Sequence, residues 1–359
     1  MTRIKVAYDV GVPIERPTGV GRYIAELARA LEELGVDLKP YRVSLRGGSV
    51  DGVAHWRIPA KVAHFSWRRS NRPAISNLVG DTALVHGTNF VLPALGASKG
   101  VLTIHDLSFD PQSGFEGNRR LSVMVPWSID HASAVIVPTA AVGAEVAARY
   151  GYPNVRIFVT PEGVNPSFFD AEPLSEAELD ALSISKPFAI AVGTLQPRKN
   201  LFRLLDAWRK VATQLTGWTL ALVGQQGEGP PIPDSPGVTR TGWVDDRHLH
   251  GLLASAEFFC YPSLYEGFGL PPLEAMAAGT PALVGDYPAA LEVVGDLGLI
   301  VDRTNPDDIA EKILQLAQDD RLRQRLAVEG RAHAATFTWN RTARTTIEAY
   351  EAALGGGVR

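Results

Sequence analysis

The sequence has very little cysteine and no long hydrophobic run. Its 359 residues include a single cysteine, so an internal disulfide is excluded. Apolar runs are interrupted well before the roughly 20 residues that a membrane-spanning helix requires. The first residues pass directly into a strand-like pattern and lack the apolar core of a signal peptide. We therefore expect a folded cytoplasmic protein rather than an integral membrane protein or a disulfide-stabilised secreted one.

An excess of charge of one sign is also missing from the whole chain, whose net charge is only −4. Residues 39–73 are the exception, because they hold eight basic residues against one acid and have a local balance of +7. Such a segment, with aromatic residues interleaved, is typical either of a solvated basic face over core aromatics or of a surface that touches anionic lipid, glycan or nucleic acid. We expect no nucleic acid and leave open a peripheral contact with the inner face of the membrane. The basic residues are Lys39, Arg42, Arg46, Arg57, Lys61, Arg68, Arg69 and Arg72, the acid is Asp51, and the aromatic residues are Trp56, Phe65 and Trp67.

Strand-like apolar runs alternate with helical periodicity along nearly the whole chain. This repetition is typical of buried parallel strands covered by helices, and the length suits two domains of roughly 150 to 180 residues each. The alternation lapses in residues 165–186, where prolines bracket an acidic stretch, so we predict α/β domains at 1–170 and 186–337, both doubly wound. The predicted strands are 4–8, 83–86, 101–104, 134–137, 155–159, 188–192, 219–223, 238–244, 257–261, 281–284 and 299–301; the predicted helices are 23–34, 121–131, 141–150, 201–215, 246–256 and 307–318.

The stretch from Pro262 to Pro281 is the most informative in the chain. It places Glu266 and Glu274 eight residues apart around a glycine-rich turn, and its paired prolines mark a helix start, so Glu274 is predicted in the first helical turn. The glycines let a ligand approach the backbone closely, and the unpaired N–H groups that open a helix offer an anion site. A ligand that carries both hydroxyls and phosphates fits this pattern, although a glutamate early in a helix also simply favours the helix dipole.

A second informative stretch runs from Val192 to Asn200. It follows a predicted strand and opens a helix, so Arg198 and Lys199 are expected to project from the carboxyl end of that strand. Two fixed cations in that place suit a diphosphate. Adjacent basic residues are otherwise common in loops, but the glutamate motif follows a strand of the same predicted sheet, which favours the ligand-binding interpretation.

Other polar residues receive weaker interpretations. Gly19 and Gly21 follow the first strand, but Ile24 stands where a dinucleotide-binding fingerprint needs a third glycine, so a nicotinamide enzyme is disfavoured. His86 is left as either structural or functional. Cys260 is predicted to be buried rather than reactive. We find no Asp-x-Asp triplet for a divalent ion, and the paired acids at 245–246 and 307–308 are interpreted as helix-start residues.

These motifs together resemble glycosyltransferase family 4, the retaining GT-B enzymes with a glutamate-x7-glutamate signature, and the resemblance runs along the full length. Two departures are Gly285-Asp286, where many members have serine or asparagine, and Leu291, where proline is usual; neither touches a charged position of the donor site. Besides the two stretches above, the resemblance rests on the amino-terminal glycine loop Thr18-Gly19-Val20-Gly21-Arg22-Tyr23, the histidine motif Thr103-Ile104-His105-Asp106-Leu107, the strand end Thr160-Pro161-Glu162-Gly163-Val164, the segment Leu291-Glu292-Val293-Val294-Gly295-Asp296 and the start of the final helices, Phe337-Thr338-Trp339.

The resemblance implies a GT-B fold, in which two Rossmann-like domains face each other across a cleft. It makes 1–170 the acceptor-binding domain, with the helix 338–359 packing back on it, and 186–337 the nucleotide-sugar-binding domain. It further implies that Glu274 accepts hydrogen bonds from the nucleotide ribose and that Arg198 and Lys199 bind the diphosphate. The remaining donor-binding positions are Glu266 with the backbone of Gly267, Phe268, Gly269 and Leu270 for the transferred sugar, Gly193 at the strand end, and the amides of Gly19 and Gly21, which would meet donor phosphates or acceptor.

The implied reaction is the transfer of a hexose from a nucleotide diphosphate sugar to a hydroxyl of a glycan, a lipid-linked acceptor or a small molecule. The implied catalytic set is His105, facing the sugar, with Arg198, Lys199 and Glu266, and no metal or cofactor is expected. GDP-mannose is the favoured donor because the Gly193–Asn200 motif most resembles mannosyl-transferring members, and a UDP-glucose type of donor is the alternative. We expect retention by front-face attack, since no clear nucleophile is available for a double displacement.

Two other classes of protein share these features. A GT-B epimerase or phosphorylase would have the same architecture. A non-catalytic nucleotide-sugar-binding partner would bind a donor without turning it over. Such a protein is expected to lose its charged site residues, but this chain has all four, namely Arg198, Lys199, Glu266 and Glu274.

Overall fold

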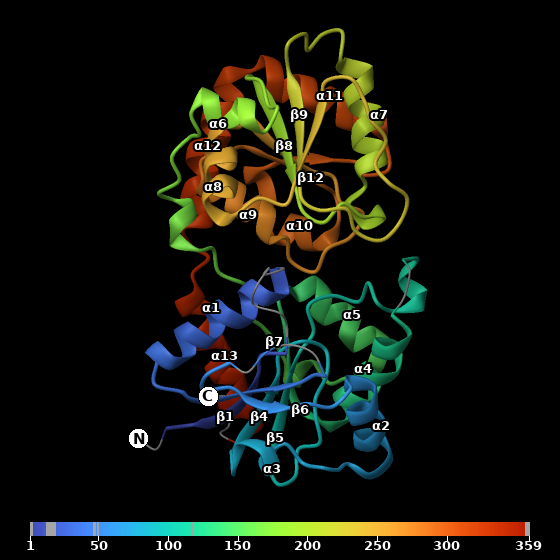
Figure 1. Ribbon diagram of the computed structural model, residues 1–359, viewed down its shortest axis with the longest axis vertical. Helices are drawn as coiled ribbons and strands as arrows, with labels where there is room; N and C mark the ends of the chain where they lie inside the picture. Colours follow the sequence, from blue (N-terminus) through green and yellow to red (C-terminus); the bar gives the residue numbers. More distant parts are fainter. Residues whose placement is uncertain (1–2, 12–18, 46–47, 49, 116–117, 356–359) are drawn as a thin grey trace. The chain divides into compact units, whose positions relative to one another are not determined.

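The structure, a computed structural model, describes residues 3–11, 19–45, 48, 50–115 and 118–355 (Figure 1). The chain divides into two units, which are considered separately. Unit 1 comprises Met1–Gly163 and Thr338–Arg359, and unit 2 comprises Val164–Phe337. In each unit a parallel sheet lies between helices, as the alternating sequence pattern predicts.

Unit 1 contains a seven-stranded parallel sheet in the order β3-β2-β1-β4-β5-β6-β7. Side chains of β1 alternate between two hydrophobic clusters: Val6 and Tyr8 pack with α1 and α13, whereas Ala7 packs with α4 and α5 on the opposite face. Burial on both faces explains the continuous apolar strand sequences. The strands are β1 (Lys5–Asp9), β2 (Asp37–Val43), β3 (Ala54–Trp56), β4 (Leu84–Gly87), β5 (Lys99–Thr103), β6 (Ala132–Val137) and β7 (Ile157–Val159); the helices are α1 (Gly19–Glu33), α2 (Ala60–Ser70), α3 (Ser76–Val79), α4 (Arg119–His131), α5 (Ala140–Tyr150) and α13 (Trp339–Ala353).

Unit 2 contains a six-stranded parallel sheet in the order β10-β9-β8-β11-β12-β13. Its two faces carry separate clusters, one formed with α8, α9 and α10 and the other with α7 and α11. The strands are β8 (Phe188–Val192), β9 (Thr219–Val223), β10 (Val238–Gly242), β11 (Phe258–Tyr261), β12 (Ala282–Gly285) and β13 (Leu299–Val301); the helices are α6 (Glu176–Ala181), α7 (Leu201–Val211), α8 (Asp246–Ser255), α9 (Leu270–Ala277), α10 (Pro288–Val293), α11 (Pro306–Gln318) and α12 (Asp320–Ala334).

The carboxyl-terminal helix α13 returns to unit 1 and packs in the same cluster as α1. Its first residue, Trp339, lies against Gly163, where a Cβ atom would come within 2.4 Å of the Trp339 backbone nitrogen. Glycine is therefore required where the two chain segments cross. Thr342 fixes the same crossing, because its hydroxyl donates to the Pro161 carbonyl at 2.7 Å.

The predicted domain boundary in residues 165–186 is wrong. The first unit ends at Gly163, and the chain from Val164 onward belongs to unit 2. The reason is packing, because Phe168, Leu174 and Ile184 are buried in the hydrophobic cluster of unit 2 despite the surrounding prolines and acids. Within the described residues, no helix is both long and apolar enough to cross a membrane.

Candidate active site

A tight turn fixes two cations at the carboxyl end of β8. Pro197–Lys199 form one 3-10 turn, and Asn200 follows in a left-handed conformation with φ of 59°, which asparagine tolerates better than most residues. The buried Asn200 amide donates to the Pro262 carbonyl at 2.9 Å and to the Arg303 carbonyl at 2.7 Å. It therefore ties together the chain segments that follow β8, β11 and β13, and it fixes where Arg198 and Lys199 begin.

Both cations pair with Glu266. The Lys199 Nζ lies 2.7 Å from Oε1 of Glu266, and the Arg198 guanidinium donates to the other carboxylate oxygen. Arg198 also donates to the Tyr265 carbonyl at 2.9 Å. Burial alone would raise the pKa of Glu266, but the charges of Lys199 and Arg198 outweigh burial and lower it to about 2. The carboxylate is therefore ionised at neutral pH, and three sequence-predicted residues form one cluster.

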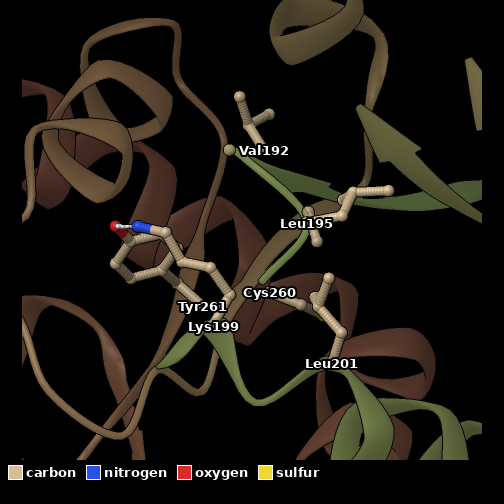
Figure 2. A pocket seen from close by; sticks show the side chains of 8 residues that line it. Val192, Leu195, Lys199, Leu201, Cys260 and Tyr261 are labelled. Carbon is tan, nitrogen blue, oxygen red and sulfur yellow. Dashed lines mark hydrogen bonds between the residues drawn. The ribbon is translucent and has the colours of Figure 1, made fainter. Parts of the chain in front are cut away.

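Tyr261, which the sequence did not single out, completes the surroundings of Lys199. The Lys199 ammonium donates to the Tyr261 hydroxyl at 2.6 Å and lies 4.6 Å from the centre of its ring. Figure 2 shows this contact beside a small pocket. The only signal in the sequence was the position of Tyr261 as the last residue of a strand before the glutamate motif. The pocket is lined by Ala191, Val192, Gly193, Leu195, Lys199, Leu201, Cys260 and Tyr261.

The pocket residues Gly193 and Cys260 have different roles. Gly193 has a φ of 140°, and a Cβ there would lie 3.3 Å from the Cε of Lys199, so glycine leaves room for the lysine stem. Cys260 is buried, as predicted, and burial raises the pKa of its thiol far above the ordinary value. The thiol is therefore protonated and poorly reactive.

The glycine-rich turn presents its backbone rather than its side chains. Phe268 and Leu270 point into the core of unit 2, and Phe268 packs against Phe337 with ring centres 6.0 Å apart. Gly269 caps α9 with a φ of 104°, a conformation that favours glycine. Phe268 and Leu270 therefore do not present their side chains to a ligand, and the role that the family resemblance implies for the backbone from Gly267 to Leu270 stays a prediction.

Glu274 lies in the second turn of α9, so its predicted place in the first turn is wrong. The helix starts at Leu270, one residue before the paired prolines, and Glu274 is its fifth residue. Prolines are tolerated there because the first N–H groups of a helix need no intrahelical partner. The Glu274 side chain is buried.

In unit 1 the predicted site residues come from α1 and the end of β5. Gly19 and Gly21 occupy the first turn of α1, so their amides belong to a helix amino terminus. Thr18, which belongs to the same sequence motif, lies outside the described residues. His105 is buried, with Nε2 2.9 Å from the Thr88 carbonyl and Nδ1 3.6 Å from Oε1 of Glu162.

Glu162 is a second residue that the sequence did not assign to the site. Its side chain is as buried as that of His105, and together with Thr88 it gives each imidazole nitrogen an oxygen neighbour. The ring of Tyr23 packs edge-on against His105 with centres 4.8 Å apart. The available signal was the position of Glu162 after β7, at the same edge of the same sheet as His105.

His86 has a structural place. Its Nδ1 lies 2.8 Å from the Tyr350 hydroxyl and its Nε2 2.7 Å from the Thr103 hydroxyl, inside the core that joins β4, β5 and α13. Burial lowers its pKa to about 3, so the ring is neutral at physiological pH. Both nitrogens are satisfied, which resolves the alternative that the sequence left open in favour of structure.

The paired acids lie at helix starts, as predicted. Asp245 caps α8 by accepting from the His248 amide, and Asp307 and Asp308 lie in the first turn of α11. In the portion of the chain that the structure describes, no group of three or more histidine, cysteine or acidic side chains has an arrangement suited to a metal ion.

The basic segment 39–73 forms β2, β3 and α2, with Arg46 outside the described residues. Trp67 is buried and packs in a hydrophobic cluster, so part of the aromatic content belongs to the core. On the exposed side of α2, however, Phe65 is 70% exposed and Val62 is 51% exposed. The exposed basic residues of α2 are Lys61, Arg68 and Arg69.

Sequence comparisons match both halves of the chain to sugar-transferring families. The model described as Glycosyltransferase Family 4 matches residues 17–168, and the model described as Glycosyl transferases group 1 matches residues 180–333. The O-antigen chain mannosyltransferase B of Escherichia coli is 31% identical over an alignment of 377 positions, gaps included, which covers 94% of this chain and 97% of that protein.

Two solved structures illustrate the fold that this chain shares. Sucrose-phosphate synthase from Thermosynechococcus elongatus superposes with a TM-score of 0.75 at 20% identity, over 99% of this chain and 100% of that one. HepE from Anabaena, in complex with UDP-glucose, superposes with a TM-score of 0.74 at 17% identity, over 97% of this chain and 100% of that one. At these identities the likeness concerns the fold.

Proposed function

This chain belongs to glycosyltransferase family 4 and has the GT-B fold, and from that premise we propose that it transfers mannose from GDP-mannose with retained anomeric configuration. The acceptor is a hydroxyl of a glycan, a lipid-linked sugar or a small molecule. The observation that carries the proposal is the cluster of Arg198, Lys199 and Glu266 at one sheet edge, beside the backbone that opens α9.

The charges of this cluster suit a diphosphate. Two cations face one carboxylate, so the cluster has a formal excess of one positive charge. A diphosphate of the donor competes with Glu266 for Arg198 and Lys199, and the carboxylate then has acceptor oxygens for hydroxyls of the sugar. The amides from Gly267 to Leu270 and the amino terminus of α9 add donors for the same ligand.

The cations also assist the bond cleavage. As the bond between the sugar carbon and the phosphate oxygen breaks, the electron pair leaves with the diphosphate, and negative charge grows beside Arg198 and Lys199. Fixed cations stabilise that charge more in the transition state than in the ground state, which accelerates the reaction. In this proposal they supply the electrostatic stabilisation without a metal ion.

The proposed stereochemistry is retention through attack on the face that the diphosphate leaves. The acceptor oxygen forms the new bond to the sugar carbon, and its proton passes to the departing phosphate oxygen. No side chain is proposed as a nucleophile, since Glu266 is assigned to accept hydrogen bonds from hydroxyls of the sugar. His105, held by Thr88 and Glu162, is proposed to contact a hydroxyl of the sugar.

Two comparisons bear on the donor. The Escherichia coli relative that aligns with nearly the whole chain is named a mannosyltransferase, which favours mannose and GDP-mannose. HepE, which has the same fold, was determined with UDP-glucose, so a UDP-glucose type of donor is the second candidate. An epimerase or phosphorylase would instead isomerise the donor or require phosphate.

A panel of nucleotide sugars tests the proposal. We expect the purified full chain to release GDP from GDP-mannose in the presence of acceptor mixtures, and proton NMR of early product to show the α-anomer of the donor preserved. Glu274→Ala is expected to abolish turnover, whereas Glu329→Ala, which removes an exposed carboxylate on α12, is the matched control. Full activity in Glu274→Ala, or no turnover of any donor by the wild type, would overturn the assignment.

For the exposed face of α2 we propose contact with an anionic membrane. Phe65 and Val62 supply apolar area, and the flanking Lys61, Arg68 and Arg69 complement anionic headgroups. We expect the protein to co-sediment with vesicles that contain phosphatidylglycerol, less so at high salt, and not with phosphatidylcholine vesicles. Phe65→Ser should weaken binding, whereas Val155→Ser, at a position that is even more exposed, should not. Equal binding to both kinds of vesicle, or none, would contradict this contact.

A further inference from the structure

A buried tyrosine hydroxyl without a hydrogen-bond partner lies beside the proposed donor site. Tyr287 follows β12 and caps α10, and its side chain is only 1% exposed. Within the described residues, its Oη has no hydrogen-bond partner. A phenylalanine would fill the same space without burying a hydroxyl, so the presence of the hydroxyl requires an explanation.

The hydroxyl is close to the backbone that opens α9. A Cβ atom built on Gly269 would lie 3.4 Å from the Tyr287 Oη, so the hydroxyl borders the glycine that caps this helix. It also lies within the field of the ion cluster. Burial raises the pKa of the Tyr287 hydroxyl well above its ordinary value, and the charge of Glu266 raises it further, while Arg198 and Arg303 oppose this. The group is therefore a neutral hydrogen-bond donor at physiological pH.

A buried hydroxyl without a hydrogen-bond partner destabilises the ligand-free protein. A ligand that accepts a hydrogen bond from this hydroxyl removes that penalty. Three features define the ligand at this place: the carboxylate of Glu266, the amides from Gly267 to Leu270, and the two cations. The first two suit hydroxyl groups, and the cations suit the diphosphate. Tyr287 borders Gly269, on the side of the cluster that suits hydroxyl groups.

We propose that the Tyr287 hydroxyl donates a hydrogen bond to one hydroxyl of the transferred hexose and thereby helps to determine which hexose the site accepts. This inference rests on the proposed function and deepens it. Tyr287 directly follows Gly285-Asp286, one of the two places where the sequence departs from the family pattern. A site that must satisfy a buried hydroxyl discriminates against a sugar that lacks the matching group.

The test is Tyr287→Phe in the full chain, with GDP-mannose and with donors that each lack one hexose hydroxyl. We expect kcat/KM for GDP-mannose to fall roughly tenfold, the effect of one lost hydrogen bond. The wild type should discriminate against one particular deoxy donor, and Tyr287→Phe should lose that discrimination alone. The affinity of Tyr287→Phe for GDP, which has no hexose, should equal that of the wild type. The Tm of Tyr287→Phe should not be lower than that of the wild type.

Tyr41→Phe is the matched control. Tyr41 of β2 is likewise buried, with a hydroxyl that has no partner within the described residues, but it belongs to unit 1. We expect this variant to keep the wild-type discrimination among donors. Wild-type donor kinetics in Tyr287→Phe would overturn the inference while leaving the proposed function intact. Weaker GDP binding in Tyr287→Phe would also overturn it, since the hydroxyl would then serve the nucleotide. Failure of the wild type to turn over any donor would overturn the proposed function itself.

Discussion

The carboxyl edges of the two sheets differ in chemistry although both units are doubly wound. In unit 2, Arg198, Lys199 and Glu266 concentrate three charges within direct contact. In unit 1 the corresponding edge presents His105, buried between the Thr88 carbonyl and Glu162. The same topology thus places three charged side chains in contact at one edge and an imidazole beside a carboxylate at the other. Fold alone therefore does not determine what such an edge binds.

The difference follows from which strands contribute. In unit 2, β8 and β11 are hydrogen-bonded neighbours, so the residues that follow them meet directly. In unit 1, His105 follows β5 and Glu162 follows β7, with β6 between them. The Glu162 carboxylate must reach past β6 to approach His105. The distance between Oε1 of Glu162 and Nδ1 of His105, 3.6 Å, is longer than the 2.7 Å between Nζ of Lys199 and Oε1 of Glu266 in unit 2. We therefore expect changes in the unit 2 cluster to have the larger effects.

Among the variants that compare the two edges, Lys199→Ala is expected to have the largest effect. Removing one of the two cations that we propose stabilise the leaving diphosphate should lower kcat/KM by about 100- to 1,000-fold, the usual range for loss of one preorganised electrostatic contact. Steady-state release of nucleotide from GDP-mannose measures it. Lys210→Ala is the control, because Lys210 is an exposed lysine of α7 that pairs with Asp307 at the surface. Comparable losses in the two variants, or none in Lys199→Ala, would show that Lys199 has no special role in the reaction.

The acid stability of the protein should depend on Glu266. Its pKa is about 2 in the folded chain against an ordinary value of 4.5, so the folded state gains stability that is present above about pH 4.5 and is lost as the pH falls toward 2. The size is on the order of 3 kcal/mol, taking about 1.4 kcal/mol per pKa unit.

Urea unfolding at pH 7, 5 and 3 measures this dependence. Glu266→Gln should flatten the loss of stability between pH 5 and 3, while Glu311→Gln, on the exposed side of α11, should leave it unchanged. The same pH dependence in wild type and Glu266→Gln would show that the cluster does not lower the pKa of Glu266.

A smaller effect is expected from Glu162→Gln in unit 1. The substitution keeps the shape of the Glu162 side chain but removes its charge beside His105. We expect it to cost about 1 to 2 kcal/mol of transition-state stabilisation, which lowers kcat roughly 5- to 30-fold. Because the positioning acts through His105, the pH profile of kcat should change, whereas the affinity for GDP should stay at the wild-type value. Glu162→Asp should restore part of the rate. An unchanged pH profile would make Glu162 merely structural.

Sequence periodicity predicted most of the sheet of unit 2, since the expected strands 188–192, 219–223 and 299–301 coincide with β8, β9 and β13. It missed β2, where Pro40 and alternating basic residues hide a strand that pairs with β1. It also missed α10 and α12. Local pattern reveals strands that are buried on both faces, but it does not reveal half-buried strands, a short helix such as α10, or a helix such as α12 that buries only three of its 15 residues.

The site was predictable where its residues are contiguous. Gly267 to Leu270, with the two glutamates, stand in one stretch, and Arg198 and Lys199 are adjacent. The contacts among them were not predictable, because the pairing of Lys199 with Glu266 and Tyr261 depends on the adjacency of β8 and β11. Glu162 was missed for the same reason.

The central claim is that Arg198 and Lys199 hold the diphosphate of a nucleotide sugar, and calorimetric titration of GDP into the full chain tests it most directly. We expect saturable binding to a single site in the wild type, at least tenfold weaker affinity in Lys199→Ala, as for loss of one charge-assisted contact, and unchanged affinity in Lys210→Ala. Equal affinity for GDP in the wild type and Lys199→Ala would contradict the claim.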